Sequence, residues 1–176
     1  MEIPGLGEVS FDADYGCYRS QPIPVAVLGG KRCTILVEDY NDDRRKAEVH
    51  EAIANFLRIS PAALQESGPH VFRYYEDCRE DWDPDNEELV EILSPAEVWR
   101  HVRLGSEPIV SRRPYGDKGI YVSLTCRCEW EPEHGLQIVF KNGLQVCKVG
   151  PYDGHVTNAD AYGDRKLEGV VYVARG

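Results

Sequence analysis

The feature that most constrains the fold is the segment from residue 121 to residue 149, which reads as three consecutive antiparallel strands. Apolar side chains occupy every second position from Val122 to Trp130, and more polar side chains occupy the positions between them. Such alternation predicts a strand with one buried face and one solvent-exposed face. The pair Asn142-Gly143 predicts a type I′ hairpin turn, because both residues accept the positive φ values that this turn requires.

The first 40 residues predict a three-stranded antiparallel meander. Strand-like alternation begins in residues 8–18, which contain an acidic corner, and continues in residues 22–28 and 32–38 on either side of Gly29-Gly30. Pro22 and Pro24 favour an edge position for the middle strand, because proline has no backbone N–H to donate to a neighbouring strand.

Residues 41–103 instead predict helices. Apolar residues recur at helical spacing from Ala47 to Leu57, and Ser60-Pro61 is typical of the start of a second helix. Gly68-Pro69 interrupts this second helix, so we expect a kink or two short helices. Two further capping residues, Asp85 and Ser94, predict later helix starts.

Residues 104–176 return to antiparallel strands and end in a loop-rich tail. The expected fold class is therefore α+β, with antiparallel sheet segments from both chain ends and a central helical insertion packed on the sheet. A chain of 176 residues with 42% hydrophobic residues can bury a core, and we expect residues 1–176 to form a single domain.

The charge balance is acidic, with 20 Lys and Arg against 30 Asp and Glu and a formal net charge of −10. This charge repels phosphate backbones and anionic membrane surfaces, so we expect no nucleic acid and no membrane as partners; a basic protein is the partner that the charge favours. The start of the sequence has no signal-peptide pattern, and the six dispersed cysteines read as reduced core residues. We therefore expect a cytoplasmic protein. Its oligomeric state is left open.

Carboxylate, amide and imidazole side chains gather in the corner after the long strand and in the tail. They are Glu131, Glu133, His134, Asp153, His155, Asn158, Asp160 and Asp164. If the tail folds back over the corner, these groups could hold a metal ion or provide an acid and a base. Solvated turns explain the same composition, because Gly and Pro accompany the acids.

No established metal or cofactor motif supports a metal or acid–base site at the corner and tail. The helical His-Glu-x-x-His spacing is absent, as are the phosphate loop and the dinucleotide-binding fingerprint. Cys126 and Cys128 lie on the apolar face of one strand, whereas structural zinc pairs span a turn. We therefore predict no metal and no cofactor.

The polar face of the long strand is a second candidate. It carries Tyr121, Ser123, Thr125 and Arg127. Tyrosine and arginine are enriched where proteins bind each other, so an exposed face with these side chains would suit a binding surface.

Five segments resemble an uncharacterised bacterial family of small cytosolic proteins that carries a domain of unknown function. They are Glu8-Val-Ser-Phe11, residues 111–117, residues 128–136, Asn142-Gly143 and residues 153–164. The resemblance covers nearly the whole chain. It implies a single bacterial domain and supplies no catalytic residue. In size and charge the chain is also similar to small acidic proteins that neutralise toxins.

Two functions follow as expectations. The first is a non-enzymatic, acidic interaction protein of the bacterial cytosol, of the immunity or antitoxin type, that binds a partner protein through its sheet face and acidic surface. The alternative is a small metal-dependent hydrolase or metal-binding protein, which would combine the corner at Glu131, Glu133 and His134 with Asp153, His155 and Asp160 of the tail.

Overall fold

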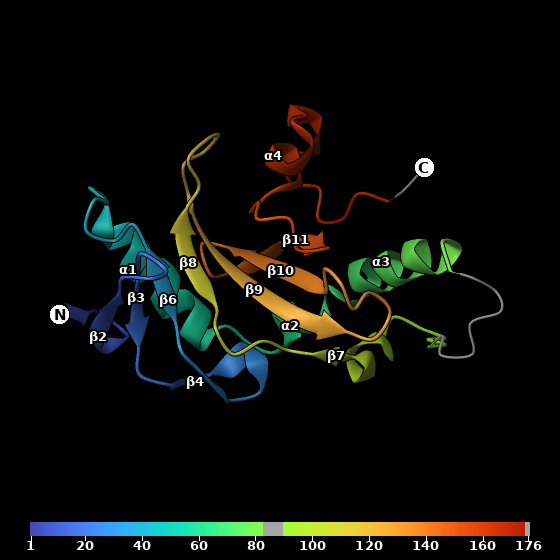
Figure 1. Ribbon diagram of the computed structural model, residues 1–176, viewed down its shortest axis with the longest axis horizontal. Coiled ribbons are helices and arrows are strands. Elements are labelled where there is room, and N and C mark those ends of the chain that lie inside the picture. The colour runs from blue at the N-terminus through green and yellow to red at the C-terminus, as the bar shows by residue number, and fades with distance from the viewer. Residues whose placement is uncertain (83–89, 175–176) are drawn as a thin grey trace.

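The computed structural model describes residues 1–82 and 90–174, which form one large mixed sheet with helices packed against it (Figure 1). Within these residues the sheet has nine strands. They are β1 (Glu2–Ile3), β2 (Gly7–Asp12), β3 (Cys17–Ser20), β6 (Leu36–Glu38), β7 (Val102–Arg103), β8 (Ile109–Arg112), β9 (Ile120–Cys128), β10 (Leu136–Lys141) and β11 (Gln145–Gly150). The strand order is β1-β2-β3-β6-β8-β9-β10-β11, and β7 pairs with β9.

Two antiparallel halves meet at one parallel pair. Strands β1, β2, β3 and β6 pair antiparallel, as do β8, β9, β10 and β11. Between the halves, β6 pairs with β8 in parallel through Leu36 opposite Ile109 and Val37 opposite Val110. The predicted α+β fold, with sheet segments from both chain ends, is confirmed. The parallel pair that joins them was not predicted.

The predicted N-terminal meander is only partly correct. The turn at Gly29-Gly30 joins β4 (Ile23–Val25) to β5 (Lys31–Cys33), but these two strands form a separate small sheet. Ser20 closes the base of this hairpin, because its backbone N–H donates to the Ile35 carbonyl and its hydroxyl accepts from the Ile35 N–H. In the main sheet β3 therefore pairs directly with β6. The segment with Pro22 and Pro24, which have no backbone N–H to donate, stays outside this sheet.

The helices are α1 (Lys46–Arg58), α2 (Ala62–Gln65), α3 (Gly68–Glu80) and α4 (Asn158–Tyr162), with short 3-10 turns η1 (Ala26–Leu28), η2 (Val98–His101) and η3 (Arg165–Leu167). The middle of the apolar stripe predicted in α1 is buried, at Val49, Ile53 and Phe56, whereas Ala47 at its start is exposed. The predicted break separates α2 from α3, which begins at Gly68-Pro69. The helix start predicted at Asp85 lies outside the described residues. The helix predicted after Ser94 is reduced to η2.

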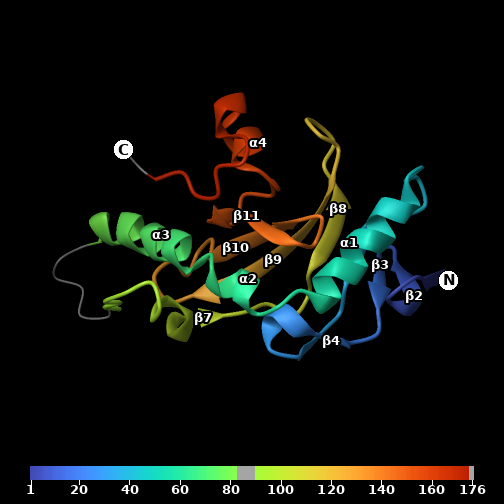
Figure 2. The same ribbon diagram turned by 180° about the vertical axis from the view of Figure 1, so that it is seen from behind.

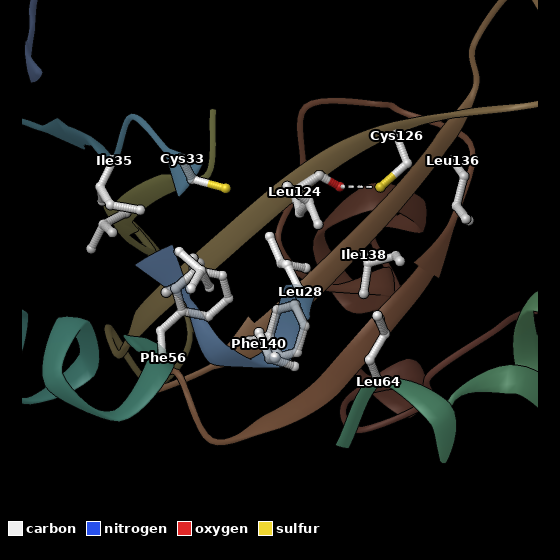
Figure 3. Close-up of a cluster of buried hydrophobic side chains, with 14 of the residues drawn as sticks. Leu28, Cys33, Ile35, Phe56, Leu64, Leu124, Cys126, Leu136, Ile138 and Phe140 are labelled. Carbon is white, nitrogen blue, oxygen red and sulfur yellow. Dashed lines mark hydrogen bonds between the residues drawn. The ribbon is translucent and has the colours of Figure 1, made fainter. Parts of the chain in front are cut away.

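The core lies between these helices and one face of β9 and β10, as Figure 3 shows. The alternation predicted for β9 holds on this face, where Val122, Leu124, Cys126 and Cys128 are all buried. Phe56 of α1 meets Phe140 of β10 edge to face, with ring centroids 5.3 Å apart.

The hairpin between β10 and β11 has the predicted type I′ character, because Asn142 and Gly143 have φ values of 50° and 67°. This turn lies against α1. A Cβ atom on Gly143 would come within 2.2 Å of the Ala52 carbonyl oxygen, so the close approach requires glycine.

The tail after β11 packs over part of the other face of the sheet. In both views α4 lies above the β11 end of the sheet and away from α1 (Figures 1 and 2). Lys148 of β11 donates to the His155 carbonyl, and the Val149 N–H donates to the Val171 carbonyl. Within residues 1–82 and 90–174, no helix is both long and apolar enough to cross a membrane.

Candidate functional site

A cleft of about 880 Å³ lies where the turn between β8 and β9 faces the tail. One wall is the end of β6, the second is the turn at residues 113–117, and the third is the tail from residue 154 to residue 168. The ionisable side chains that line it are Glu38, Asp39, Arg112, Arg113, Tyr115, Asp117, His155, Asp160, Arg165 and Glu168.

Arg113 forms the floor of this acidic cleft and is only 3% exposed. Its Nε and Nη2 donate to Asp160 at 2.6 and 2.8 Å, and its Nη1 and Nη2 donate to Glu168 at 2.7 and 3.0 Å. Each carboxylate therefore accepts two hydrogen bonds from one planar guanidinium, the strongest geometry for such a pair. These bonds, first to Asp160 and then to Glu168, raise the pKa of Arg113.

The sequence Tyr-Gly-Asp occurs in two turns, at residues 115–117 and 162–164. All three residues of the first turn and Gly163 of the second line the acidic cleft. Their glycines, Gly116 and Gly163, have φ values of 60° and 64°, so both turns place glycine in the left-handed region that other residues rarely adopt. A Cβ atom on Gly116 would lie 2.7 Å from Cζ of Arg113. The guanidinium thus rests directly on the backbone of the first turn.

The neighbouring residue, Arg112, binds a different part of the chain. Its Nε donates to Asp43 at 2.8 Å and its Nη1 donates to Glu48 at 2.7 Å, near the start of α1. Successive residues of an extended chain point to opposite sides, so Arg112 and Arg113 bind different segments although they are adjacent in sequence. Arg112 therefore secures α1, whereas Arg113 secures the tail.

The acidic cleft carries an excess of negative charge. Its lining contains five carboxylates and three guanidinium groups, and Arg112 is further neutralised by Asp43 and Glu48 outside the cleft. Partial burial, together with the adjacent charge of Asp39, raises the pKa of Glu38. Tyr115 stands at the rim with 71% of its surface exposed. The site is thus acidic, with an aromatic edge.

The predicted exposed face of the long strand is wrong for its first half. Tyr121 and Ser123 are buried, whereas Thr125 and Arg127 are exposed. The Tyr121 hydroxyl donates to Asp117 at 3.0 Å, and burial raises the Tyr121 pKa to about 12. Ser123 accepts a hydrogen bond of 2.9 Å from Gln137. Tyr121 and Ser123 therefore do not offer a free binding surface.

A buried lysine explains why this face is covered. Lys148 is 1% exposed and donates to Gln137 at 2.9 Å, to the His155 carbonyl at 3.0 Å and to the carboxylate of Asp153. Burial lowers the pKa of Lys148, and Asp153 partly offsets this effect. The lysine therefore holds the start of the tail against the polar face of the sheet.

The corner and tail residues, which would have formed one site if the tail had brought them together, lie in separate groups. Glu131 accepts hydrogen bonds from the backbone of Glu133 and His134 at 3.0 and 3.2 Å, so the corner is closed by its own turn. The tail reaches the corner through the Tyr152 N–H, which donates to the His134 carbonyl at 3.3 Å. Across the part of the chain that the structure describes, His, Cys, Asp and Glu form no group of three or more that could hold a metal ion.

The predicted tail residues have different surroundings. Asp153 joins Lys148, and His155 Nδ1 lies 3.5 Å from Asp153. The buried Asn158 side chain donates to the carbonyls of Val170 and Val171, and Asp164 accepts from the Lys166 N–H. Of the predicted set, His155 and Asp160 line the acidic cleft.

Eight ionisable residues of the acidic cleft were not predicted as site residues. They are Glu38, Asp39, Arg112, Arg113, Tyr115, Asp117, Arg165 and Glu168. The sequence signal that could have indicated the site is the repeated Tyr-Gly-Asp turn, together with the Arg112-Arg113 pair before its first copy.

The fold and the cleft define an α+β protein with a charged site between a hairpin turn and the C-terminal tail. Residues 5–156 match the family described as "Domain of unknown function (DUF6985)", and the chain belongs to this family. The family resemblance noted in the sequence is therefore confirmed, with no assigned activity. Asp160 and Glu168 lie beyond the matched segment. No curated protein and no solved structure matched the chain.

Proposed function

We propose that this protein is a non-enzymatic interaction protein of the bacterial cytosol, of the immunity or antitoxin type, and that it binds a basic partner protein through the acidic cleft. The observation that carries the proposal is the excess of carboxylates in the cleft, where the most buried guanidinium, Arg113, is already bound by Asp160 and Glu168. A cationic side chain of a partner would therefore be attracted there rather than repelled.

Glu38 and Asp39 are the carboxylates best placed to receive such a side chain. No ion pair joins either of them to another described residue, whereas Asp117 is paired with Lys141 at 2.6 Å. Placing a lysine or arginine beside Glu38 would also remove the repulsion between Glu38 and Asp39, which contributes to the raised pKa of Glu38.

The surroundings of the cleft support the same proposal. The exposed ring of Tyr115 at the rim could act as an anchor and contact a cation through its face. The net charge of −10 would speed the encounter with a basic partner. All six cysteines are free thiols, which supports a reducing compartment.

A titration with a defined basic peptide tests this proposal. The probe is a short arginine- and lysine-rich peptide, followed by NMR at the backbone amides of the cleft glycines Gly116, Gly154 and Gly163. We expect saturable shifts at these amides. The double substitution Glu38→Gln and Asp39→Asn should weaken binding about tenfold, as expected for the loss of two charge-assisted contacts.

The matched control removes the same charge from another surface, through Glu8→Gln and Asp14→Asn, which are exposed and lie outside the cleft. This control should bind the peptide nearly as well as the unmodified protein. Equal weakening by both double substitutions would mean that net charge alone attracts the peptide, and the proposed site would be wrong.

A further inference from the structure

Arg103 of β7 and Arg127 of β9 occupy directly opposite positions in an antiparallel pair. Directly opposite side chains lie on the same face of a sheet, and like charges in that arrangement destabilise it. Both residues are exposed, and no described residue forms an ion pair or side-chain hydrogen bond with either guanidinium. Two like charges therefore face each other on one side of the sheet, and neither has a described ion-pair partner.

The backbone keeps the two arginines together. A Cβ atom on Gly105, just after β7, would lie 2.1 Å from the Thr125 carbonyl oxygen, so the two segments touch along their main chains. On the other side of the pair, the Glu129 N–H donates to the His101 carbonyl at 3.1 Å. Lys31 also donates to the Leu104 carbonyl. Strands β7 and β9 could move apart to relieve the repulsion only if these backbone contacts were lost.

A third arginine lines the same place. Arg100, in η2, borders a hollow of about 440 Å³ together with Arg103 and Arg127. Of the described residues that line this hollow, one is acidic, Glu129. Its carboxylate lies 2.7 Å from Nδ1 of His101. The hollow thus gathers three guanidinium groups against one carboxylate, in a chain with a net charge of −10.

We infer that this basic hollow binds a dianion of the phosphate class through Arg100, Arg103 and Arg127. Guanidinium groups present paired N–H donors that match phosphate oxygens, and several of them around one dianion form charge-assisted hydrogen bonds. A dianion between Arg103 and Arg127 replaces their mutual repulsion with attraction. The ligand chemistry is that of free phosphate or of a small phosphate monoester.

This site is independent of the proposed binding of a basic partner. The residues that line the basic hollow are not among those that line the acidic cleft, and the two sites attract opposite charges. Loss of one function therefore does not imply loss of the other, and their tests use different probes and different substitutions.

Calorimetric titration with inorganic phosphate, and separately with methyl phosphate, tests the inference. Chloride at the same ionic strength serves as the reference. We expect saturable binding of phosphate beyond that of chloride, weakened about tenfold or more by Arg103→Gln and by Arg127→Gln, since each substitution removes charge-assisted hydrogen bonds. Tighter binding of methyl phosphate than of phosphate would assign the site to an ester; equal or weaker binding would assign it to the free ion.

The same substitutions provide a second readout without any ligand. Because each removes the cross-strand repulsion, Arg103→Gln and Arg127→Gln should fold and melt at or above the temperature of the unmodified protein at low salt. The control is Arg44→Gln, an exposed arginine outside the hollow, which should retain phosphate binding. Phosphate binding that is absent, no stronger than chloride binding, or unchanged in both hollow variants would overturn the inference.

Discussion

Arg113 holds Asp160 in a bidentate pair, with Nε to Oδ2 at 2.6 Å and Nη2 to Oδ1 at 2.8 Å. The two residues lie 47 positions apart in the sequence, one after β8 and the other in α4. The almost completely buried guanidinium also donates two hydrogen bonds to Glu168, so Arg113 joins the hairpin turn to the tail at two places. The shape of the acidic cleft therefore depends on one arginine.

Replacing Arg113 with methionine should lower the free energy of unfolding by about 2–3 kcal/mol, since it leaves two carboxylates without their buried partner. Asp160 and Glu168 keep some contact with water, at 19% and 47% side-chain exposure, so the full cost of a buried charge does not apply. Urea denaturation measures the change. The control, Arg165→Met, alters an exposed arginine of the same cleft and should cost less than about 0.5 kcal/mol. Equal losses in the two variants would contradict this role of Arg113.

Acid should destabilise the protein partly through Asp117. Burial opposes its ionisation, but hydrogen bonds from Lys141, the Gly119 N–H and Tyr121 lower the Asp117 pKa to about 2. A carboxyl whose pKa is lower in the folded state stabilises the protein above its ordinary pKa, and this stabilisation is lost as the pH falls through the folded value. The free energy of unfolding should therefore decrease as the pH falls from about 4 to about 2.

Asp117→Asn isolates this contribution. The variant should be less stable than the unmodified protein at neutral pH, and its stability should depend less on pH between about 4 and about 2. Denaturation curves across this range provide the measurement. An identical pH dependence in both proteins would show that Asp117 does not carry the effect.

Gly143→Ala should destabilise the protein by more than the ~1–2 kcal/mol that a left-handed backbone costs an ordinary residue. The added Cβ would also meet the Ala52 carbonyl oxygen at 2.2 Å, and backbone atoms cannot move aside easily. Gly154→Ala is the matched control, because Gly154 has φ +78° and no atom within 4 Å of the added Cβ. Thermal melting should show a clearly larger loss for Gly143→Ala; a similar loss would mean that the turn does not pack tightly on α1.

Local patterns in the sequence predicted the local parts of the fold. Alternation along β9 identified its core face, and Asn142-Gly143 identified the turn, because both depend on residues within a few positions of each other. The break at Gly68-Pro69 was equally predictable from the chemistry of proline. These features required no knowledge of distant segments.

The missed features all depend on distant segments. Tyr121 and Ser123 alternate as exposed residues should, yet both are buried. Lys141 of β10 lies over the Tyr121 ring, and Ser123 is bonded by Gln137, which Lys148 of β11 holds in place. Arg113 is an ordinary polar residue in sequence, and its role appears only when Asp160 and Glu168 fold against it. The alternation of apolar and polar residues indicates which side chains share a face of a strand, but it does not indicate which other segments cover that face.

Divalent metal ions should not raise the melting temperature of the protein. A metal-binding role required Glu131, Glu133 and His134 to meet Asp153, His155 and Asp160, and these residues lie in separate groups with their own partners. Binding to the folded state alone always raises the melting temperature, so the measurement is direct. A clear rise with millimolar magnesium, calcium or zinc that is lost in Glu131→Gln would restore the metal-dependent alternative.

The two residue pairs that join β6 to β8 have a consequence for how the chain reaches its native state. Leu36 and Ile109 lie 73 positions apart, whereas the hairpins on either side of this junction connect strands that are close in sequence. Closing a long loop costs conformational entropy before the contacts that it allows can stabilise the chain. The hairpins within each half should therefore form early, and the junction between β6 and β8 should form late. The slowest folding step is then the meeting of the two halves, and substitutions that weaken the junction at Val37 or Val110 should slow refolding more than they speed unfolding.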